Sequence, residues 1–257
     1  MNNLYGKTIF ITGATKGIGR SCALAYAEKG ANLILTARSS DLLDSLKEEL
    51  IRKYGIRVHT LVIDVRNSKD VEDKVKSLPE SFKKIDILIN NAGLALGLDK
   101  VYLASPTDID TVIDTNIKGM LYVTSAIVPL MLKNNSGYVV NIGSIAGDAA
   151  YAGGAIYCAS KAAVKTFSDG LRIDLVDSNI RVTNIKPGLV ETEFSKVRFK
   201  GDLEKANNTY KGIDALTPDD VANVVIYATG LPENIQLTEI AMTPNHQADG
   251  RTVHREN

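Results

Sequence analysis

The amino-acid sequence predicts an α/β fold, a single domain built on a doubly wound parallel sheet of about seven strands with helices on both faces. Short, continuous apolar runs rich in β-branched residues alternate with stretches of helical periodicity. Strands with such runs are usually covered on both faces, and alternation with helices gives right-handed βαβ units. No low-complexity linker divides the 257 residues, so one domain over 1–257 is expected.

The predicted elements follow one another in strict alternation along the chain. Seven strands are expected at 7–12, 31–37, 57–63, 86–90, 138–143, 181–186 and 239–242. Helices are expected near 18–29, 40–53, 68–77, 107–133, 154–177 and 218–229, the last opened by Thr217-Pro218.

Two segments fall outside this alternation. Residues 189–217 form a long polar insertion, which in a compact domain is typical of a substrate lid or binding loop. Residues 243–257 form a tail without periodicity, for which a frayed terminus and an ordered segment both remain open.

The composition argues against several classes of protein. Lysine plus arginine equals aspartate plus glutamate, 30 each, so no global charge attracts nucleic acid or an anionic membrane. The start lacks a secretory signal pattern, and no apolar run approaches the ~18 residues of a membrane span. The two cysteines, Cys22 and Cys158, form neither a disulfide framework nor a metal motif. The three histidines lack zinc-ligand spacing, so no metal and a cytoplasmic location are expected.

A glycine-rich turn follows the first strand and opens the first helix. Its glycines are Gly13, Gly17 and Gly19. Such a turn lets backbone N–H groups approach a pyrophosphate at a helix N-terminus, as in Rossmann-like folds. The spacing GxxxGxG differs from the commoner GxGxxG, and a purely structural turn is the alternative. We therefore expect a dinucleotide site here.

The residues after the second strand favour NADP over NAD. A carboxylate that would bind a ribose 2′-hydroxyl is missing, and Arg38 stands in its place. Arg38 and Lys16 suit a 2′-phosphate, although each alone could be a solvated basic residue. Asp64 and Val65 end the third strand near the expected adenine position, and Asn90–Gly93 ("NNAG") ends the fourth beside the same crevice.

The helix over 154–177 carries a tyrosine and a lysine one turn apart, Tyr157 and Lys161. A buried ammonium is costly, so this pairing on a core-facing helix needs a reason. The pKa of a free phenol is about 10, and a neighbouring ammonium would lower it toward the range useful for general acid–base catalysis. A structural pair is the alternative.

These motifs together resemble the classical short-chain dehydrogenases/reductases. The order and spacing of the family are met by "TGATKGIG", "NNAG", Asn116, Ser144, "YCASK" and "PG" at 187–188. The resemblance implies that Tyr157 is the general acid/base and that Lys161 supports it and binds the nicotinamide ribose. It also implies that Ser144 orients the substrate oxygen and that Asn116 binds a water of the proton relay.

The same resemblance implies a set of NADP-binding residues and a small-molecule substrate. The set is Gly13, Thr15, Lys16, Gly17, Ile18, Gly19, Arg38, Ser39, Asp64, Val65, Asn91, Ala92, Gly93, Tyr157, Lys161, Pro187, Gly188, Val190 and Thr192. Relatives usually form tetramers through the two long helices, here 107–133 and 154–177, so a homotetramer is expected.

The segments after residue 188 are similar to one subgroup, the NADP-dependent 3-hydroxy acid dehydrogenases. That similarity implies a substrate such as serine, allo-threonine or 3-hydroxypropionate, held by Ser144, Tyr157 and a cation. We predict Arg198 as the carboxylate clamp, because a planar guanidinium matches a carboxylate; a solvated basic loop is the alternative. A reductase of larger ketones or acyl-carrier thioesters and a non-catalytic NADP-binding sensor are the competing functions.

Overall fold

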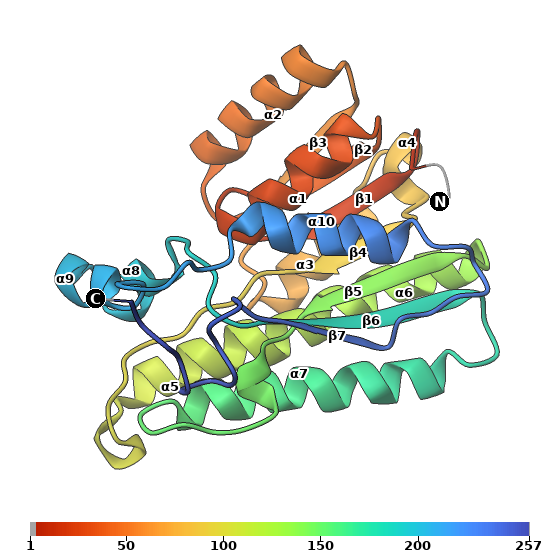
Figure 1. The fold of residues 1–257 in the computed structure, drawn as a ribbon. Coiled ribbons are helices and arrows are strands. Elements are labelled where there is room, and N and C mark those ends of the chain that lie inside the picture. The colour runs from red at the N-terminus through yellow and green to blue at the C-terminus, as the bar shows by residue number, and fades with distance from the viewer. Residues whose placement is uncertain (1–3, 257) are drawn as a thin grey trace.

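A parallel sheet forms the middle layer of the protein, and helices cover both of its faces (Figure 1). The computed structural model describes residues 4–256; residues 1–3 and 257, the two ends of the expected domain, lie outside the described residues. The strands lie in the order β3-β2-β1-β4-β5-β6-β7, and every pair is parallel. The doubly wound fold is confirmed.

The strands agree with the predicted ranges to within a residue at nearly every end. They are β1 (Thr8–Thr12), β2 (Asn32–Ala37), β3 (Val58–Val62), β4 (Ile87–Asn90), β5 (Gly137–Ile142), β6 (Ile180–Pro187) and β7 (Glu239–Met242). The agreement is close because the central strands are buried on both faces, so the apolar run in the sequence and the strand coincide.

The main helices also agree with the predicted ones, and several short helices were missed. The helices are α1 (Gly17–Glu28), α2 (Ser40–Tyr54), α3 (Ser68–Lys76), α4 (Glu80–Lys83), α5 (Pro106–Ile113), α6 (Met120–Lys133), α7 (Ala155–Asp174), α8 (Phe194–Arg198), α9 (Leu203–Asn208) and α10 (Pro218–Thr229). The missed helices α4, α8 and α9 have four to six residues, too few for a visible period.

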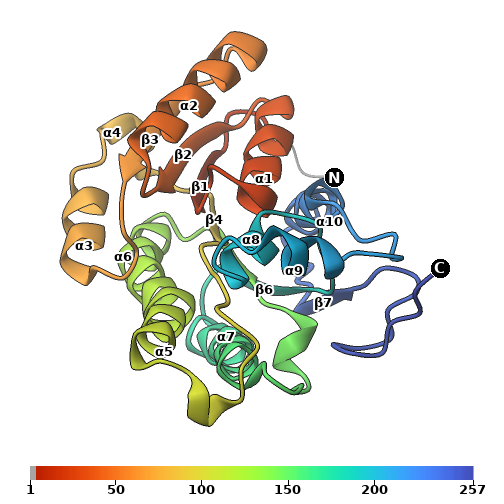
Figure 2. The same cartoon turned by 90° about the vertical axis from the view of Figure 1, so that its left-hand side faces the viewer.

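Two separate apolar cores bury the faces of the sheet. One packs α1, α2 and α10 against side chains such as Ile9 and Ile11 of β1. The other packs α3, α4 and α6 against the opposite side, which includes Phe10 of the same strand. Figure 2 shows α1 and α10 on one side of the strands and α6 and α7 on the other. Both layers hold the sheet rigidly, which fixes the loops at its carboxyl edge.

The predicted helix over 107–133 is interrupted in its middle. Residues Asp114–Gly119 form a π-helical turn, η2, between α5 and α6. A π turn adds one residue to a helical turn and is frequent at functional sites. It contains Asn116, one of the predicted catalytic residues, whose side chain is 2% exposed.

The tail is packed against the domain rather than frayed. Gln247 is buried, and its Oε1 atom accepts a hydrogen bond from the backbone N–H of Leu189 at 2.8 Å. Gln247 also pairs with Val253 in an isolated antiparallel bridge. Further on, the backbone N–H of Glu256 donates to the carbonyl of Gly212 at 2.9 Å. The tail is therefore held in place by hydrogen bonds to the segment over 189–217.

Candidate active site

A cleft with a volume of about 300 Å³ lies at the carboxyl edge of the sheet. Gly13 after β1, Asn91 after β4, Gly143 after β5 and Gly188 after β6 all line it. The strand order reverses between β1 and β4, because β2 and β3 lie on one side and β5 to β7 on the other. Open α/β sheets bind their ligands at such a switch point.

The glycine turn forms one wall of the cleft. Gly13 and Gly17 have φ values of +63° and +50°, which L side chains rarely adopt. A Cβ added to Gly19 would lie 2.3 Å from the carbonyl oxygen of Gly13 and 2.5 Å from Nδ2 of Asn91. Only glycine fits at position 19, and the turn stays close to the strand end.

The turn presents backbone donors at the start of α1. The helix begins at Gly17, and the side chain of the preceding Lys16 makes no cap hydrogen bond. The first N–H groups of a helix have no partners within the helix and carry the positive end of its dipole. No acidic side chain lies in that first turn. This glycine cradle therefore fits the pyrophosphate of a dinucleotide.

Asn91 fastens the neighbouring strand end to the turn. Its Nδ2 atom donates to the carbonyl oxygens of Thr12 and Gly13 at 2.9 and 3.1 Å, and its backbone N–H donates to the Thr12 hydroxyl at 2.9 Å. The backbone N–H of Ala92 donates to the same hydroxyl at 2.9 Å. Asn91 and Ala92 thus hold the loop after β4 against the first strand.

The predicted residues near the adenosine end lie along the same edge of the sheet but beyond the walls of this cleft. Arg38 follows β2 and is exposed, and Ser39 caps α2. Asp64 follows β3, where Arg66 binds both of its carboxylate oxygens. That pairing with Arg66 lowers the pKa of Asp64. The positive charge of Arg38 also lowers this pKa.

The remaining predicted cofactor residues divide between the cleft wall and its support. On the wall lie Lys16, Ile18, Gly93, Pro187, Val190 and Thr192. Thr15 and Val65 do not line the cleft. Val65 is buried beside Gly119, and a Cβ added to Gly119 would lie 2.6 Å from the Cγ2 atom of Val65. Val190 and Thr192 come from the segment after β6, and the Thr192 side chain lies next to Gly17.

Tyr157 and Lys161 lie together in α7, as the sequence predicts. The Nζ atom of Lys161 is 5.8 Å from the centre of the Tyr157 ring and donates a hydrogen bond to the carbonyl of Ile142 at 2.8 Å. Lys161 is 7% exposed, and burial lowers its pKa to about 8. Two further N–H groups of the ammonium remain available to a ligand.

The pKa of Tyr157 is raised in this structure, whereas the sequence-based expectation is a lowered one. Burial of the phenol is the largest cause, and the neighbouring Tyr151 adds to it. Ser144 and Arg198 act in the opposite direction. The Lys161 ammonium donates its hydrogen bond to the carbonyl of Ile142 in β5.

Asn116 links three parts of the site through its amide. Its Oδ1 atom accepts from the backbone N–H of Leu94 at 2.8 Å, and its Nδ2 atom donates to the Leu94 carbonyl at 2.8 Å. Nδ2 also donates to the Ser160 hydroxyl at 3.0 Å, which donates to the Tyr157 carbonyl at 2.7 Å. The amide therefore supports the loop after β4 and the start of α7.

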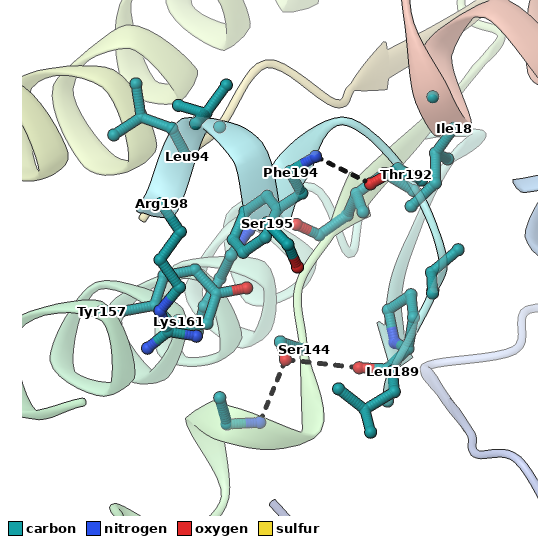
Figure 3. A pocket seen from close by; sticks show the side chains of 18 of the residues that line it. Ile18, Leu94, Ser144, Tyr157, Lys161, Leu189, Thr192, Phe194, Ser195 and Arg198 are labelled. Carbon is teal, nitrogen blue, oxygen red and sulfur yellow. Dashed lines mark hydrogen bonds between the residues drawn. The ribbon is translucent and has the colours of Figure 1, made fainter. Parts of the chain in front are cut away.

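Ser144 follows β5 and faces the cleft. Its hydroxyl accepts from the backbone N–H of Ala146 at 3.1 Å and donates to the Pro187 carbonyl at 3.3 Å. The serine is 8% exposed. Figure 3 shows both hydrogen bonds, which fix the hydroxyl on the side of the cleft opposite α8. The hydrogen bond to the Pro187 carbonyl is long, so the hydroxyl can rotate and donate to a ligand oxygen instead.

Arg198 reaches into the cleft from α8 and lies over Tyr157 (Figure 3). Its guanidinium carbon is 5.7 Å from the centre of the Tyr157 ring. The Nε atom donates to the carbonyl of Gly97 at 3.2 Å, and the Gly97 backbone N–H donates to the Arg198 carbonyl at 2.8 Å. The predicted anion clamp and the predicted acid/base therefore lie side by side, although they are 41 positions apart in the sequence.

Sequence reasoning missed several residues of the cleft wall, among them four with large side chains. Phe194 packs edge-on against Tyr157 with ring centres 5.6 Å apart, and the hydroxyl of Tyr210 donates to the Val190 carbonyl at 3.0 Å. Gln247 comes from the tail, and Tyr151 lies beside Arg198. No spacing signal marks them: Phe194 begins the short helix α8, and the other three lie outside the named helices and strands.

The described residues hold neither a cluster of metal-binding side chains nor a helix suited to span a membrane. Within 4–256, no three His, Cys, Asp or Glu side chains are grouped so that they could hold a metal ion. In the same range, no helix combines the length and apolar character needed to cross a membrane.

Residues 7–202 match the family model of the short chain dehydrogenases, which covers most of the chain. The glycine cradle and the buried Tyr157–Lys161 pair stand where that resemblance implies them. The chain belongs to the short-chain dehydrogenase family, as its sequence motifs predict.

Individual relatives extend over the whole chain. The NADP-dependent 3-hydroxy acid dehydrogenase of Schizosaccharomyces pombe is 44% identical over 256 residues, 99% of each chain. The NADP-dependent 3-hydroxy acid dehydrogenase YdfG of Salmonella typhi is 47% identical over 249 residues, 96% of this chain and 99% of the relative. A solved structure, the closed form of serine dehydrogenase complexed with NADP+, has a TM-score of 0.90 at 45% identity and covers 97% of this chain and 100% of that chain.

Proposed function

We propose that this protein is an NADP-dependent oxidoreductase that transfers a hydride between the nicotinamide and the 3-hydroxyl or 3-oxo carbon of a small 3-hydroxy acid. The observation that carries the proposal is the meeting of Arg198 with Tyr157 in one cleft, 5.7 Å from guanidinium carbon to ring centre. A 3-hydroxy acid has its carboxylate and its reacting hydroxyl two carbons apart, so one molecule can contact both groups. The 3-hydroxy acid relatives support this reading.

The chain's own residues bind the substrate and move a proton. Tyr157 takes the hydroxyl proton during oxidation and returns it during reduction. Ser144 donates a hydrogen bond to the same substrate oxygen and holds it beside the phenol. Lys161 binds the ribose next to the nicotinamide, and Asn116 maintains the loop and helix around them. When bound, NADP accepts the hydride in oxidation and NADPH donates it in reduction.

The proposed cofactor residues are those named from the sequence, with Arg38 and Lys16 selecting the 2′-phosphate. Charge-assisted hydrogen bonds of this kind contribute about 1.5–3 kcal/mol each. We expect Arg38→Ala to weaken NADP+ binding about 10- to 100-fold and to leave NAD+ binding within about threefold. Titration calorimetry with both cofactors checks this, and Arg52→Ala on the exposed end of α2 is the matched control. Equal losses for NADP+ and NAD+ would contradict the assignment.

The rate of oxidation should depend on pH through Tyr157. The base form of the phenol is needed for oxidation, and burial raises the pKa of this group. Hence kcat/KM for oxidation should rise with pH from about pH 7 into the alkaline range, by up to about tenfold per unit of pH below that pKa. Reduction needs the protonated phenol, so its kcat/KM should stay level and fall only at the highest pH. An oxidation profile that falls across this range would contradict the role of Tyr157.

Arg198 provides the experiment that tests the substrate class. Arg198→Met removes the charge and keeps an unbranched side chain of similar length. We expect kcat/KM for 3-hydroxypropionate to fall about 10- to 100-fold, since a charged hydrogen bond is lost. Turnover of 3-hydroxypropionamide, its neutral analogue, should stay within about twofold. An equal loss of kcat/KM on both compounds would contradict the proposal that Arg198 binds the carboxylate.

The other parts of the proposal concern the surroundings of the site. Residues 189–217 act as a substrate lid, and the chain forms a homotetramer through α5, α6 and α7 in the cytoplasm. Apolar side chains that are exposed on these helices and the loop before them support an interface: Leu132, Ile173, Val101 and Leu103. Their exposure in a single chain is costly in water and is removed by burial against another copy. Sedimentation of the purified protein measures the assembly.

A further inference from the structure

Tyr151 lies beside Arg198 in the wall of the cleft. Its hydroxyl oxygen accepts a hydrogen bond from Nη2 of Arg198 at 3.0 Å, and the guanidinium carbon is 5.6 Å from the centre of its ring. The tyrosine belongs to the irregular segment before α7, six residues ahead of Tyr157. Two aromatic rings, those of Tyr157 and Tyr151, therefore lie close to the Arg198 guanidinium.

The orientation of the Tyr151 ring is fixed by its surroundings. A Cβ added to Gly154 would lie 2.1 Å from its Cε2 atom, and one added to Gly250 would lie 3.1 Å from its Cδ1 atom. The guanidinium carbon of Arg251 lies 5.1 Å from the ring centre, and that side chain also donates to the Ala152 carbonyl. The ring thus fills a slot that only glycine neighbours allow, and its hydroxyl is directed at Arg198.

Tyr151 and Arg198 each keep a hydrogen-bond donor that has no partner in the hydrogen bonds described above. The Tyr151 oxygen accepts the Arg198 hydrogen bond, so the hydroxyl proton can still be donated. Burial raises the pKa of Tyr151, and the hydroxyl therefore stays protonated at neutral pH. Arg198 uses Nε for Gly97 and Nη2 for Tyr151, which leaves the Nη1 group for a ligand. Tyr151 and Arg198 both line the cleft, so two adjacent donors of different kinds are available there.

We propose that Tyr151 is a specificity-determining residue, the second donor of a two-part carboxylate site in which its hydroxyl binds one carboxylate oxygen and Nη1 of Arg198 binds the other. The inference rests on the proposed 3-hydroxy acid function and deepens it. A carboxylate has two oxygens in one plane and accepts from both sides, so two neighbouring donors distinguish it from an alcohol or an amide. Tyr151 takes no proton from the reacting hydroxyl, because that role belongs to Tyr157.

The variant Tyr151→Phe tests the proposal. It removes only the hydroxyl and retains the ring in its glycine slot, so folding should be unaffected, which thermal melting checks. We expect KM for 3-hydroxypropionate to rise about tenfold with kcat within about twofold, and kinetics on 3-hydroxypropionamide to be unchanged. Tyr227→Phe, on the half-exposed face of α10, is the matched control and should resemble the parent protein on both compounds.

The same substitution in an Arg198→Met background separates binding from positioning. If Tyr151 binds the carboxylate itself, adding Tyr151→Phe lowers kcat/KM for the acid by a further factor of about three or more. If it only holds Arg198 in place, the second substitution has no effect, and the proposal is overturned. Unchanged kinetics of Tyr151→Phe on both compounds would also overturn it while leaving the proposed function intact. Failure of the parent protein to oxidise any acid would instead overturn the proposed function.

Discussion

Replacing Tyr157 with phenylalanine should abolish most of the activity. Tyr157 is the acid/base of the proposed function, and its phenol lines the cleft together with Ser144, Lys161 and Arg198. Removal of a general acid/base lowers kcat by about 10²–10⁴-fold. The ring contacts to Phe194 and Arg198 do not need the hydroxyl, so the folded structure should be retained. Steady-state oxidation of 3-hydroxypropionate measures the effect.

The loss must be separated from a loss of cofactor binding. We expect Tyr157→Phe to bind NADP+ within about threefold of the parent protein, because the glycine cradle and Lys161 are unchanged. Tyr102→Phe is the matched control, since that ring is 74% exposed and lies outside the cleft. Retention of more than a tenth of the parent kcat by Tyr157→Phe would show that another group moves the proton.

Replacing Gly19 with alanine should have the second large effect. The added carbon would lie 2.3 Å from the Gly13 carbonyl and 2.5 Å from Nδ2 of Asn91, so the first turn of α1 must move away from the strand end. Overpacking of this kind costs about 1–3 kcal/mol in stability. The displaced turn no longer presents its N–H groups to the pyrophosphate, and NADP+ affinity should fall about 100-fold or more. Calorimetry measures the binding, and thermal melting measures the stability.

Gly170→Ala is the matched control for this substitution. Nothing lies within 4 Å of the carbon added at position 170, which is inside α7, and its φ is not positive. Alanine favours a helix over glycine by up to about 1 kcal/mol, so this variant should melt at the same or a higher temperature and bind NADP+ normally. If Gly19→Ala bound NADP+ as tightly as Gly170→Ala does, the glycine turn would not be the pyrophosphate site.

The layers of the fold, the order of the helices and strands along the chain and the juxtaposition of Tyr157 and Lys161 could be predicted from the sequence. Their signals are local: an apolar run gives a strand, a glycine turn before a helix gives the cradle, and four-residue spacing places Tyr157 above Lys161. The π turn around Asn116 could not be predicted, since its residues continue the helical periodicity on both sides.

The surroundings of the substrate were harder to predict for a physical reason. Arg198 was chosen from a basic stretch by its chemistry, but its position over Tyr157 depends on the packing of α8 against the loop at Gly97. Tyr151 and Gln247 carry no motif and enter the cleft from an irregular segment and from the tail. The direction of the Tyr157 pKa shift also depends on burial, which no sequence spacing reveals.

The central claim is that the protein oxidises small 3-hydroxy acids with NADP+. The most direct test follows formation of reduced nicotinamide by the purified protein, with NADP+ and separately with NAD+. The substrates are serine, allo-threonine, 3-hydroxypropionate and 3-hydroxyisobutyrate, with a neutral secondary alcohol as the control. We predict turnover of one or more of the acids with NADP+, at least about tenfold faster than with NAD+, and little turnover of the alcohol. Turnover of the neutral alcohol alone, or a preference for NAD+, would contradict it.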